Sequence, residues 1–196
     1  MRIRSFRALR AAPEFVADLA SPPYDVMDAA EARKMAEGNP RSFLRVSRAE
    51  IEFPDGADPY APAVYEKAAA NFRDFIGRGW LSRDARPGLY LYSQQFGTHR
   101  QCGLVATYAV EDYERNIILK HEKTRQKPED DRSRHIAAVR AQTGPVFLAY
   151  RDRPEITAMM ERDTAAAPLY DFTAPDGVRH SVWAASDPAA YERAFG

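Results

Sequence analysis

The sequence predicts an α+β fold with a mixed, largely antiparallel sheet and flanking helices. Two pairs of strand-like runs each flank a tight turn, which is typical of antiparallel hairpins: residues 89–96 and 101–110 around Gly97-Thr98, and residues 169–172 and 178–184 around Asp176-Gly177. Between residues 60 and 77, apolar side chains recur at helical spacing. Helical and strand-like patterns therefore occur together in one chain, without internal repeats.

Caps and breakers define the other elements in order along the chain. Asp28 is predicted to cap a helix that runs to Glu37, and Gly38-Asn39-Pro40 stops it. Pro128 suits the first turn of a helix that runs to about Gln142. Further helices are predicted at 14–20, at 155–162 and from Asp187-Pro188 onward, and further strands at 3–9, 42–53, 115–120 and 145–150.

Composition limits the classes of protein that the chain can belong to. Of 196 residues, 45% are apolar and 29% are charged, which is ordinary for one globular domain, and we expect a single domain over residues 1–196. The 28 basic and 28 acidic residues balance, so binding to nucleic acid is not expected. No run of roughly 18 apolar residues suggests a membrane span. The single cysteine, Cys102, indicates a reducing cytoplasm. The oligomeric state stays open.

The densest group of reactive side chains is the segment from His121 to Arg132, which follows the apolar run Ile117-Ile118-Leu119. We expect that run to be a buried strand and the segment to be a polar loop leading into a helix, where folds commonly place their chemistry. The alternative is a solvated loop whose acids only cap the helix. His135 follows Asp131 by four residues, so the two are expected to pair along that helix.

The residue types in this segment suit phosphate or nucleotide handling. Arg125, Lys127 and Arg132 are candidate phosphate contacts, because guanidinium and ammonium groups bind phosphate oxygens. Either His121 or Glu122 is a candidate general base, since successive strand residues face opposite ways.

The carboxylates of the same segment are candidate metal ligands. Asp130 and Asp131 could hold Mg²⁺ that accompanies a nucleotide. Without a cation these acids would repel a bare phosphate at the start of the helix. The chain has no glycine-rich phosphate loop, no zinc-ligand spacing and no nucleophile elbow.

The turn Pro22-Pro23-Tyr24-Asp25 offers a second candidate contact with a small-molecule ligand. Tyr24 could stack on a base and Asp25 could contact a hydroxyl group. Prolines alone also explain a chain reversal there, in which Tyr24 packs on the core, and this interpretation is favoured.

Several short motifs together resemble a known family, the bacterial and archaeal proteins with the "domain of unknown function 1015". The residues that carry the resemblance are Pro22-Pro23-Tyr24-Asp25-Val26, Asn39-Pro40 with Ser42-Phe43-Leu44, Leu89-Tyr90-Leu91-Tyr92, Gly103-Leu104, His121-Glu122-x-Thr124-Arg125, Asp130-Asp131-Arg132, Gly144-Pro145-Val146-Phe147-Leu148 and Asp176-Gly177-Val178-x-His180 with Trp183. One departure is Pro128, which occupies a position where the family usually has lysine.

The resemblance implies that the chain is the N-terminal portion of a longer family architecture. Family members typically run about twice this length, and their second half carries an Asp-Gly-His-His-Arg motif similar to the ParB/sulfiredoxin-like superfamily. That superfamily contains nucleotide-binding partition proteins and small-molecule kinases that act on serine. By resemblance, we expect binding of a phosphorylated small molecule or nucleotide and phosphoryl transfer linked to serine metabolism. The alternatives are a non-catalytic interaction or regulatory module and a ParB-like, DNA-associated protein.

Overall fold

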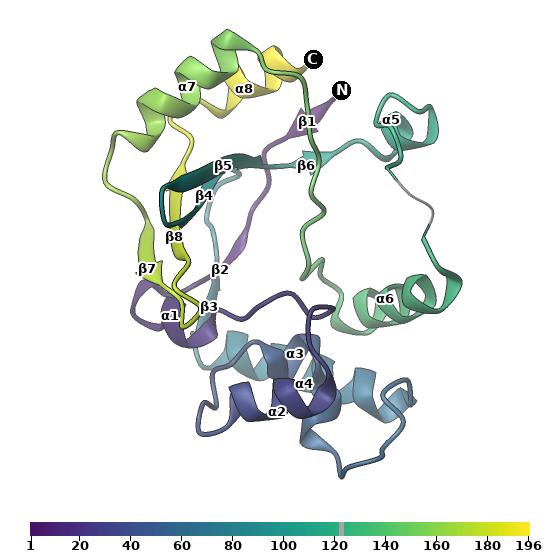
Figure 1. Cartoon of the computed structure of the whole chain (residues 1–196). Coiled ribbons are helices and arrows are strands. Elements are labelled where there is room, and N and C mark those ends of the chain that lie inside the picture. Colours follow the sequence, from purple (N-terminus) through teal and green to yellow (C-terminus); the bar gives the residue numbers. More distant parts are fainter. Residues whose placement is uncertain (122–123) are drawn as a thin grey trace. The chain divides into compact units, whose positions relative to one another are not determined.

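The computed structural model describes residues 1–121 and 124–196, and it confirms the predicted α+β class (Figure 1). The chain divides into two compact units. One, here called the sheet unit, comprises Met1–Pro13, Arg83–Glu122 and Ala149–Gly196. The other, the helical unit, comprises Glu14–Ser82 and Lys123–Leu148. The expectation of one domain over residues 1–196 stays a prediction.

The sheet unit is built on a four-stranded antiparallel sheet with the order β5-β4-β8-β7. Its strands are β4 (Tyr90–Phe96), β5 (His99–Val105), β7 (Tyr170–Thr173) and β8 (Arg179–Ala184). Both predicted hairpins are therefore confirmed, β4 with β5 and β7 with β8. The predicted N-terminal strand is shorter than expected: β1 (Ile3–Arg4) pairs with β6 (Thr107–Tyr108), and β2 (Leu9–Ala11) follows.

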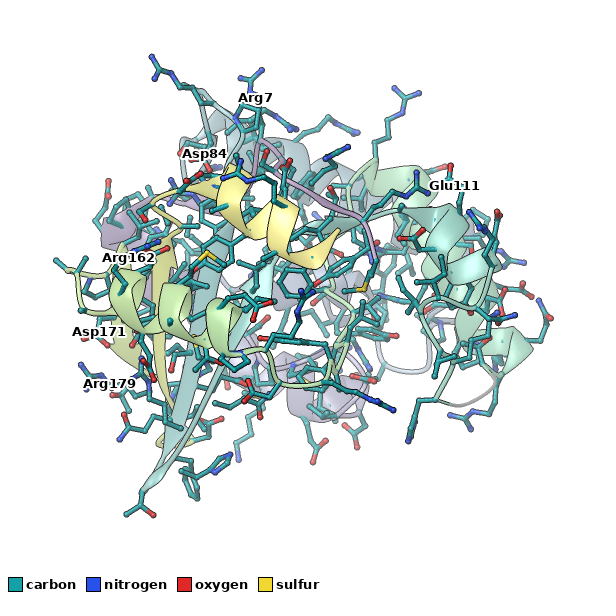
Figure 2. All side chains as sticks on the ribbon, turned by 90° about the horizontal axis from the view of Figure 1, so that it is seen from above. Arg7, Asp84, Glu111, Arg162, Asp171 and Arg179 are labelled. Carbon is teal, nitrogen blue, oxygen red and sulfur yellow. The ribbon has the colours of Figure 1, made fainter. Side chains whose placement is uncertain are left out.

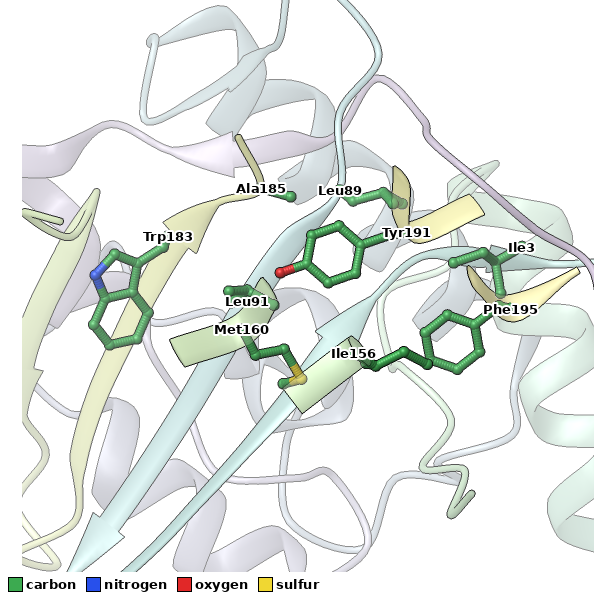
Figure 3. Packing of buried hydrophobic residues seen from close by; sticks show 9 residues of the cluster. All are labelled: Ile3, Leu89, Leu91, Ile156, Met160, Trp183, Ala185, Tyr191 and Phe195. Atoms are coloured by element: carbon green, nitrogen blue, oxygen red, sulfur yellow. The ribbon is translucent and has the colours of Figure 1, made fainter. Parts of the chain in front are cut away.

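Two helices pack on one face of this sheet and close the core of the sheet unit. They are α7 (Pro154–Thr164) and α8 (Pro188–Phe195). The latter begins at Asp187-Pro188 as predicted, and the Asp187 side chain caps it. Tyr191 lies at the centre of the cluster in Figure 3 and is fully buried, and its hydroxyl donates to Asp163 Oδ2 at 3.1 Å. The buried members of this cluster are Ile3, Leu89, Leu91, Ile156, Met160, Trp183, Ala185, Tyr191 and Phe195.

Charged side chains reinforce the surface of the sheet unit. Arg179 on β8 donates from Nε and one terminal nitrogen to the two carboxylate oxygens of Asp171 on β7, at 2.8 and 2.6 Å, and Figure 2 shows the two side chains together. Arg10 makes a similar forked contact with Asp84. The first pair joins the two strands of the β7–β8 hairpin, eight residues apart, and the second joins segments 74 residues apart in sequence.

The helical unit contains the long predicted helix α4 (Pro62–Gly77), whose apolar stripe is buried except for Ile76. Phe43 packs edge-on against Phe72 and Phe75 of that helix. The other helices of the unit are α1 (Val16–Leu19), α2 (Ala29–Ala36), α3 (Leu44–Ser47), the 3-10 turn η2 (Ala49–Glu52) and α6 (Gln126–Val139). Two short elements have residues in both units: the 3-10 turn η1 (Pro13–Phe15) and the strand β3 (Leu81–Arg83).

The strand predicted at 42–53 is wrong, because this segment forms α3 and η2. Leu44 of α3 and Ile51 of η2 are both buried, and both enter the cluster with Ala32 and Ala36 of α2. Arg45 between them donates to the carbonyl oxygens of Ala36 and Asn39, which satisfies the end of α2. A strand would direct Arg45 away from those acceptors.

The strand predicted at 115–120, with its buried run 117–119, is also wrong. A short helix, α5 (Val110–Glu114), ends there, and Asn116 has a positive φ of 55°. The amides of Ile117 and Ile118 both donate to the carbonyl oxygen of Asp112, so the chain turns instead of extending. Leu119 is 80% exposed.

The strand predicted at 145–150 has no ladder partner within the described residues. Val146 and Phe147 are 73% and 77% exposed. High strand propensity therefore does not produce a strand here, since a strand needs a neighbour to accept its hydrogen bonds.

Candidate functional site

A hollow of about 330 Å³, lined by polar and charged residues, lies in the helical unit beside the first turns of α6. Its lining residues are Tyr60, Gln126, Lys127, Asp130, Asp131 and Arg134. Four of them, at positions 127, 130, 131 and 134, follow the i, i+3, i+4, i+7 spacing of one helix face, which is why α6 presents them together. We call this the α6 hollow. It contains three residues predicted as site residues, Lys127, Asp130 and Asp131.

Helix α6 begins two residues before the predicted start and ends three before the predicted end. Pro128 is thus its third residue, where the missing amide costs nothing because first-turn amides have no acceptor within the helix. Arg125 occupies the N-cap position with extended backbone and an exposed side chain. Arg140 ends the helix with a φ of 59°, in the left-handed region.

Asp131 is held at both carboxylate oxygens. The hydroxyl of Tyr65, on α4, donates to Asp131 Oδ1 at 2.8 Å. Arg132 donates to Oδ2 from Nε at 3.0 Å and from Nη2 at 2.6 Å. Burial and the neighbouring Asp131 carboxylate raise the pKa of Tyr65 to about 12, so the phenol keeps its proton and remains a donor.

Tyr24 contributes to the same network, through Arg132. The Arg132 guanidinium carbon lies 3.9 Å from the centroid of the Tyr24 ring, in stacking distance. Arg48 fixes the turn that carries Tyr24, because its Nη1 donates to the carbonyl oxygens of Tyr24 at 2.7 Å and Met27 at 3.0 Å. The aromatic face of Tyr24 is therefore in contact with a cation, and the half-buried ring lies against α6.

The two cations of the α6 hollow, Lys127 and Arg134, make different contacts. Lys127 Nζ lies 4.4 Å from the ring centroid of Tyr60, and its side chain is exposed. Arg134 is exposed as well and lies close enough to Tyr65 to oppose the rise in the pKa of that phenol. Asp130 accepts a hydrogen bond from Gln126 Nε2 at 2.8 Å.

Other predicted site residues are not part of this arrangement. His121 belongs to the sheet unit and is exposed, and Glu122 lies outside the described residues. Asp25 is exposed and has no hydrogen bond or ion pair within the residues that the structure describes. The expected grouping of His121 and Glu122 with the phosphate contacts stays a prediction.

The fit of the site to Mg²⁺ can be tested on Asp130 and Asp131. No group of three or more His, Cys, Asp or Glu side chains is placed to hold a metal within residues 1–121 and 124–196. Both oxygens of Asp131 are already bonded to Tyr65 and Arg132. The arrangement thus offers Asp130 alone as an available carboxylate, too few for a protein-built cation site.

Sequence reasoning missed Tyr60, Tyr65 and Arg134. Helical spacing from Asp130 and Lys127 could have found Arg134, which follows them by four and seven residues. The two tyrosines lie on or just before α4, more than sixty residues upstream by sequence number, and no local pattern connects them with α6.

The comparisons with known proteins give one match. A family described as "Protein of unknown function (DUF1015)" matches residues 3–194. No curated protein and no solved structure matches the chain. No helix within the described residues has both the length and the apolar character needed to cross a bilayer.

Proposed function

The chain belongs to the DUF1015 family of proteins of unknown function, and from that premise we propose that its helical unit binds a phosphorylated small molecule or nucleotide at the α6 hollow. The observation that carries the proposal is the combination of two exposed cations, Lys127 and Arg134, with a neighbouring acid, Asp131, whose charge is already compensated.

Charge compensation removes the main objection to an anionic ligand at this place. Two adjacent carboxylates at the start of a helix would repel phosphate. Arg132 forms an ion pair with Asp131 at 2.6 Å, and both side chains are largely buried, with 25% and 15% exposure. Lys127 and Arg134 then face only Asp130 as an uncompensated acid in the α6 hollow. The remaining net charge of the α6 hollow is therefore positive, which favours an anionic ligand.

In this proposal Tyr65 and Tyr24 have supporting roles. Tyr65 holds one oxygen of Asp131, and Tyr24 supports the flat face of Arg132, so the ion pair is fixed on two sides. A fixed ion pair leaves no freedom for Asp131 to turn toward the ligand. In this proposal Arg132 acts by neutralising Asp131, in place of the direct phosphate contact that the sequence suggested.

Phosphoryl transfer linked to serine metabolism is the finer part of the proposal, and its support is the family resemblance. In that reaction Asp130 would contribute to Mg²⁺ brought by a nucleotide. The general-base role expected of His121 or Glu122 stays a prediction from the sequence. Nothing in the α6 hollow requires turnover, so binding is the part to test first.

Calorimetric titration of the whole chain with phosphoserine, ATP and inorganic phosphate, with and without Mg²⁺, tests the proposal. We expect heat of binding with at least one of them, weakened roughly tenfold or more by Lys127→Met or Arg134→Met, because each removes one charge-assisted contact worth about 1.5–3 kcal/mol. Arg73→Met, which removes an exposed arginine from α4, is the matched control and leaves binding unchanged. Absence of heat in every titration, or equal affinity in all variants, contradicts the proposal.

A second candidate, a non-catalytic interaction module, is favoured by one observation. Residues 145–148 of the helical unit belong to no helix or strand, and Val146 and Phe147, side by side in sequence, are 73% and 77% exposed. Sedimentation at rising concentration distinguishes the two functions: Phe147→Ser abolishes association if this segment is an interface, and leaves phosphate binding intact if the α6 hollow is the site.

A further inference from the structure

Three flat rings stack in a row across three neighbouring strands of the sheet unit. Phe172 on β7 and His180 on β8 have ring centroids 5.2 Å apart and ring planes 18° apart. His180 and Tyr92 on β4 follow at 5.9 Å and 11°. The Tyr92 hydroxyl and His180 Nδ1 are 2.7 Å apart, which fixes the two rings together. We call these three residues the ring ladder.

The ring ladder lies on the face of the sheet opposite α7 and α8. Leu91 and Trp183 point into the core cluster of that unit, and side chains alternate between faces along a strand. Tyr92 follows Leu91 directly on β4, so its ring is on the other face. Phe172 and His180 are direct partners in the β7–β8 register and share that face.

The next position in the ring ladder, on β5, is a glycine. Gly103 is the direct partner of Tyr92 in the antiparallel register, so a side chain there would stand beside the Tyr92 ring. Gly103 is exposed, and a Cβ built on it would have no atom within 4 Å. The space beside Tyr92, on the side away from His180, is therefore open.

No feature of the backbone requires glycine at this position. Gly103 does not adopt a positive φ, and the β4–β5 pairing continues through it without a bulge. Glycine weakens the interior of a strand, and it often marks a bulge, a tight bend or a site where a ligand or another backbone approaches closely. Within the sheet unit no described atom makes that approach.

We propose that the flat heteroaromatic ring of a nucleobase stacks on Tyr92 above Gly103 and forms the fourth member of the ring ladder. Gln94 and Gln101 are direct partners one step along the same face, and both are exposed. Their amides carry the donor and acceptor groups that read the edge of a base. This site is separate from the α6 hollow and does not depend on the proposed function.

The test uses the whole chain and adenosine, which has a base and no phosphate. Binding is followed by heteronuclear NMR, with shifts expected at the amides of Tyr92 and Gly103. Gly103→Val fills the open space and Tyr92→Leu removes the stacking ring, and each is expected to weaken binding roughly five- to hundredfold. Tyr92→Phe keeps the ring and retains binding within about threefold, and Arg73→Ala, which removes an exposed side chain from α4, is the matched control that leaves it unchanged.

A further titration distinguishes a base that belongs to a nucleic acid from the base of a free nucleoside or nucleotide. A short oligoadenylate that binds more tightly than adenosine indicates single-stranded nucleic acid, and equal affinity indicates a free nucleoside or nucleotide. Thermal melting establishes that Gly103→Val is folded, and Tyr92→Leu gives an independent answer if it is not. Adenosine that fails to bind, or that binds Gly103→Val and Tyr92→Leu as it binds the unaltered chain, overturns the proposal.

Discussion

His135 shows how a buried ionisable side chain contributes to the helical unit at the scale of one residue. It lies on α6 with 3% exposure, and Nε2 is 2.9 Å from the carbonyl oxygen of Val46 on α3. The expected pairing with Asp131 is therefore replaced by a bond to the backbone of another helix. A neutral imidazole with a proton on Nε2 satisfies that carbonyl oxygen and attaches α6 to α3.

Burial gives His135 a predictable effect of pH on stability. Desolvation lowers its pKa from the ordinary value of 6.5 and outweighs the opposing effect of the hydrogen bond to the Val46 carbonyl oxygen. Arg132 also lowers the pKa, and Asp131 and Glu50 raise it. The unfolded chain therefore binds more protons on this residue than the folded chain. As pH falls below 6.5, the free energy of unfolding should decrease. Urea titrations between pH 7.5 and about 5 measure this decrease.

Variants identify which histidine causes this dependence of stability on pH. His135→Gln keeps an amide donor near Val46 and should make the free energy of unfolding less dependent on pH in that range. His99→Gln, which removes an exposed histidine from β5, should leave this dependence unchanged. A His135→Gln variant that retains the full pH dependence would assign it to another group, such as His180, whose pKa burial also lowers.

At the scale of the element, α2 shows a helix start that sequence alone predicts. Asp28 Oδ1 accepts from the amide of Glu31 at 2.9 Å, and Glu31 Oε2 accepts from the amide of Asp28 at 2.9 Å. This reciprocal arrangement is a capping box. Asp28→Ala should lower the free energy of unfolding by about 1 kcal/mol, measured by urea denaturation. Asp25→Ala, three residues earlier and exposed, is the control and should be neutral.

Elements with a strong period were predicted well, and short apolar runs were not. The stripe of α4 and the hairpin β4–β5 have enough repeats to identify their period. The runs at 42–53, 115–120 and 145–150 have too few repeats to identify a period, and their apolar residues alone predict strands. Side-chain hydrogen bonds from Arg45, main-chain bonds to Asp112 and the absence of a neighbouring strand in the described residues decided otherwise.

At the scale of the whole molecule, the path of the chain links the two units. The chain passes from one to the other at residues 13/14, 82/83, 122/123 and 148/149, so neither is a continuous piece of sequence. Loss of one unit removes the constraints that close the segments of the other. We therefore expect one cooperative unfolding transition.

The two tryptophans provide the measurement, because each unit contains one. Trp183 is buried in the sheet unit, and Trp80 packs against Phe75 in the helical unit with ring centroids 5.1 Å apart. In urea, fluorescence of Trp80→Phe reports on the sheet unit and that of Trp183→Phe on the helical unit. For each variant, the fluorescence midpoint is compared with the circular dichroism midpoint of the same variant, so that the effect of the substitution on stability cancels. Fluorescence and circular dichroism midpoints that coincide in both variants agree with one transition, and midpoints that separate show independent unfolding.

By itself, the sequence determined the α+β class, the hairpins, the caps and the shared face of Lys127, Asp130 and Asp131, because these depend on spacing along the chain. Only the tertiary structure placed Tyr65 against Asp131, Tyr24 against Arg132, and the rings of Phe172, His180 and Tyr92 in one row. The partners in these contacts lie between 8 and 108 residues apart in sequence, brought together by burial of separate apolar faces. Local periodicity carries no information about which faces meet.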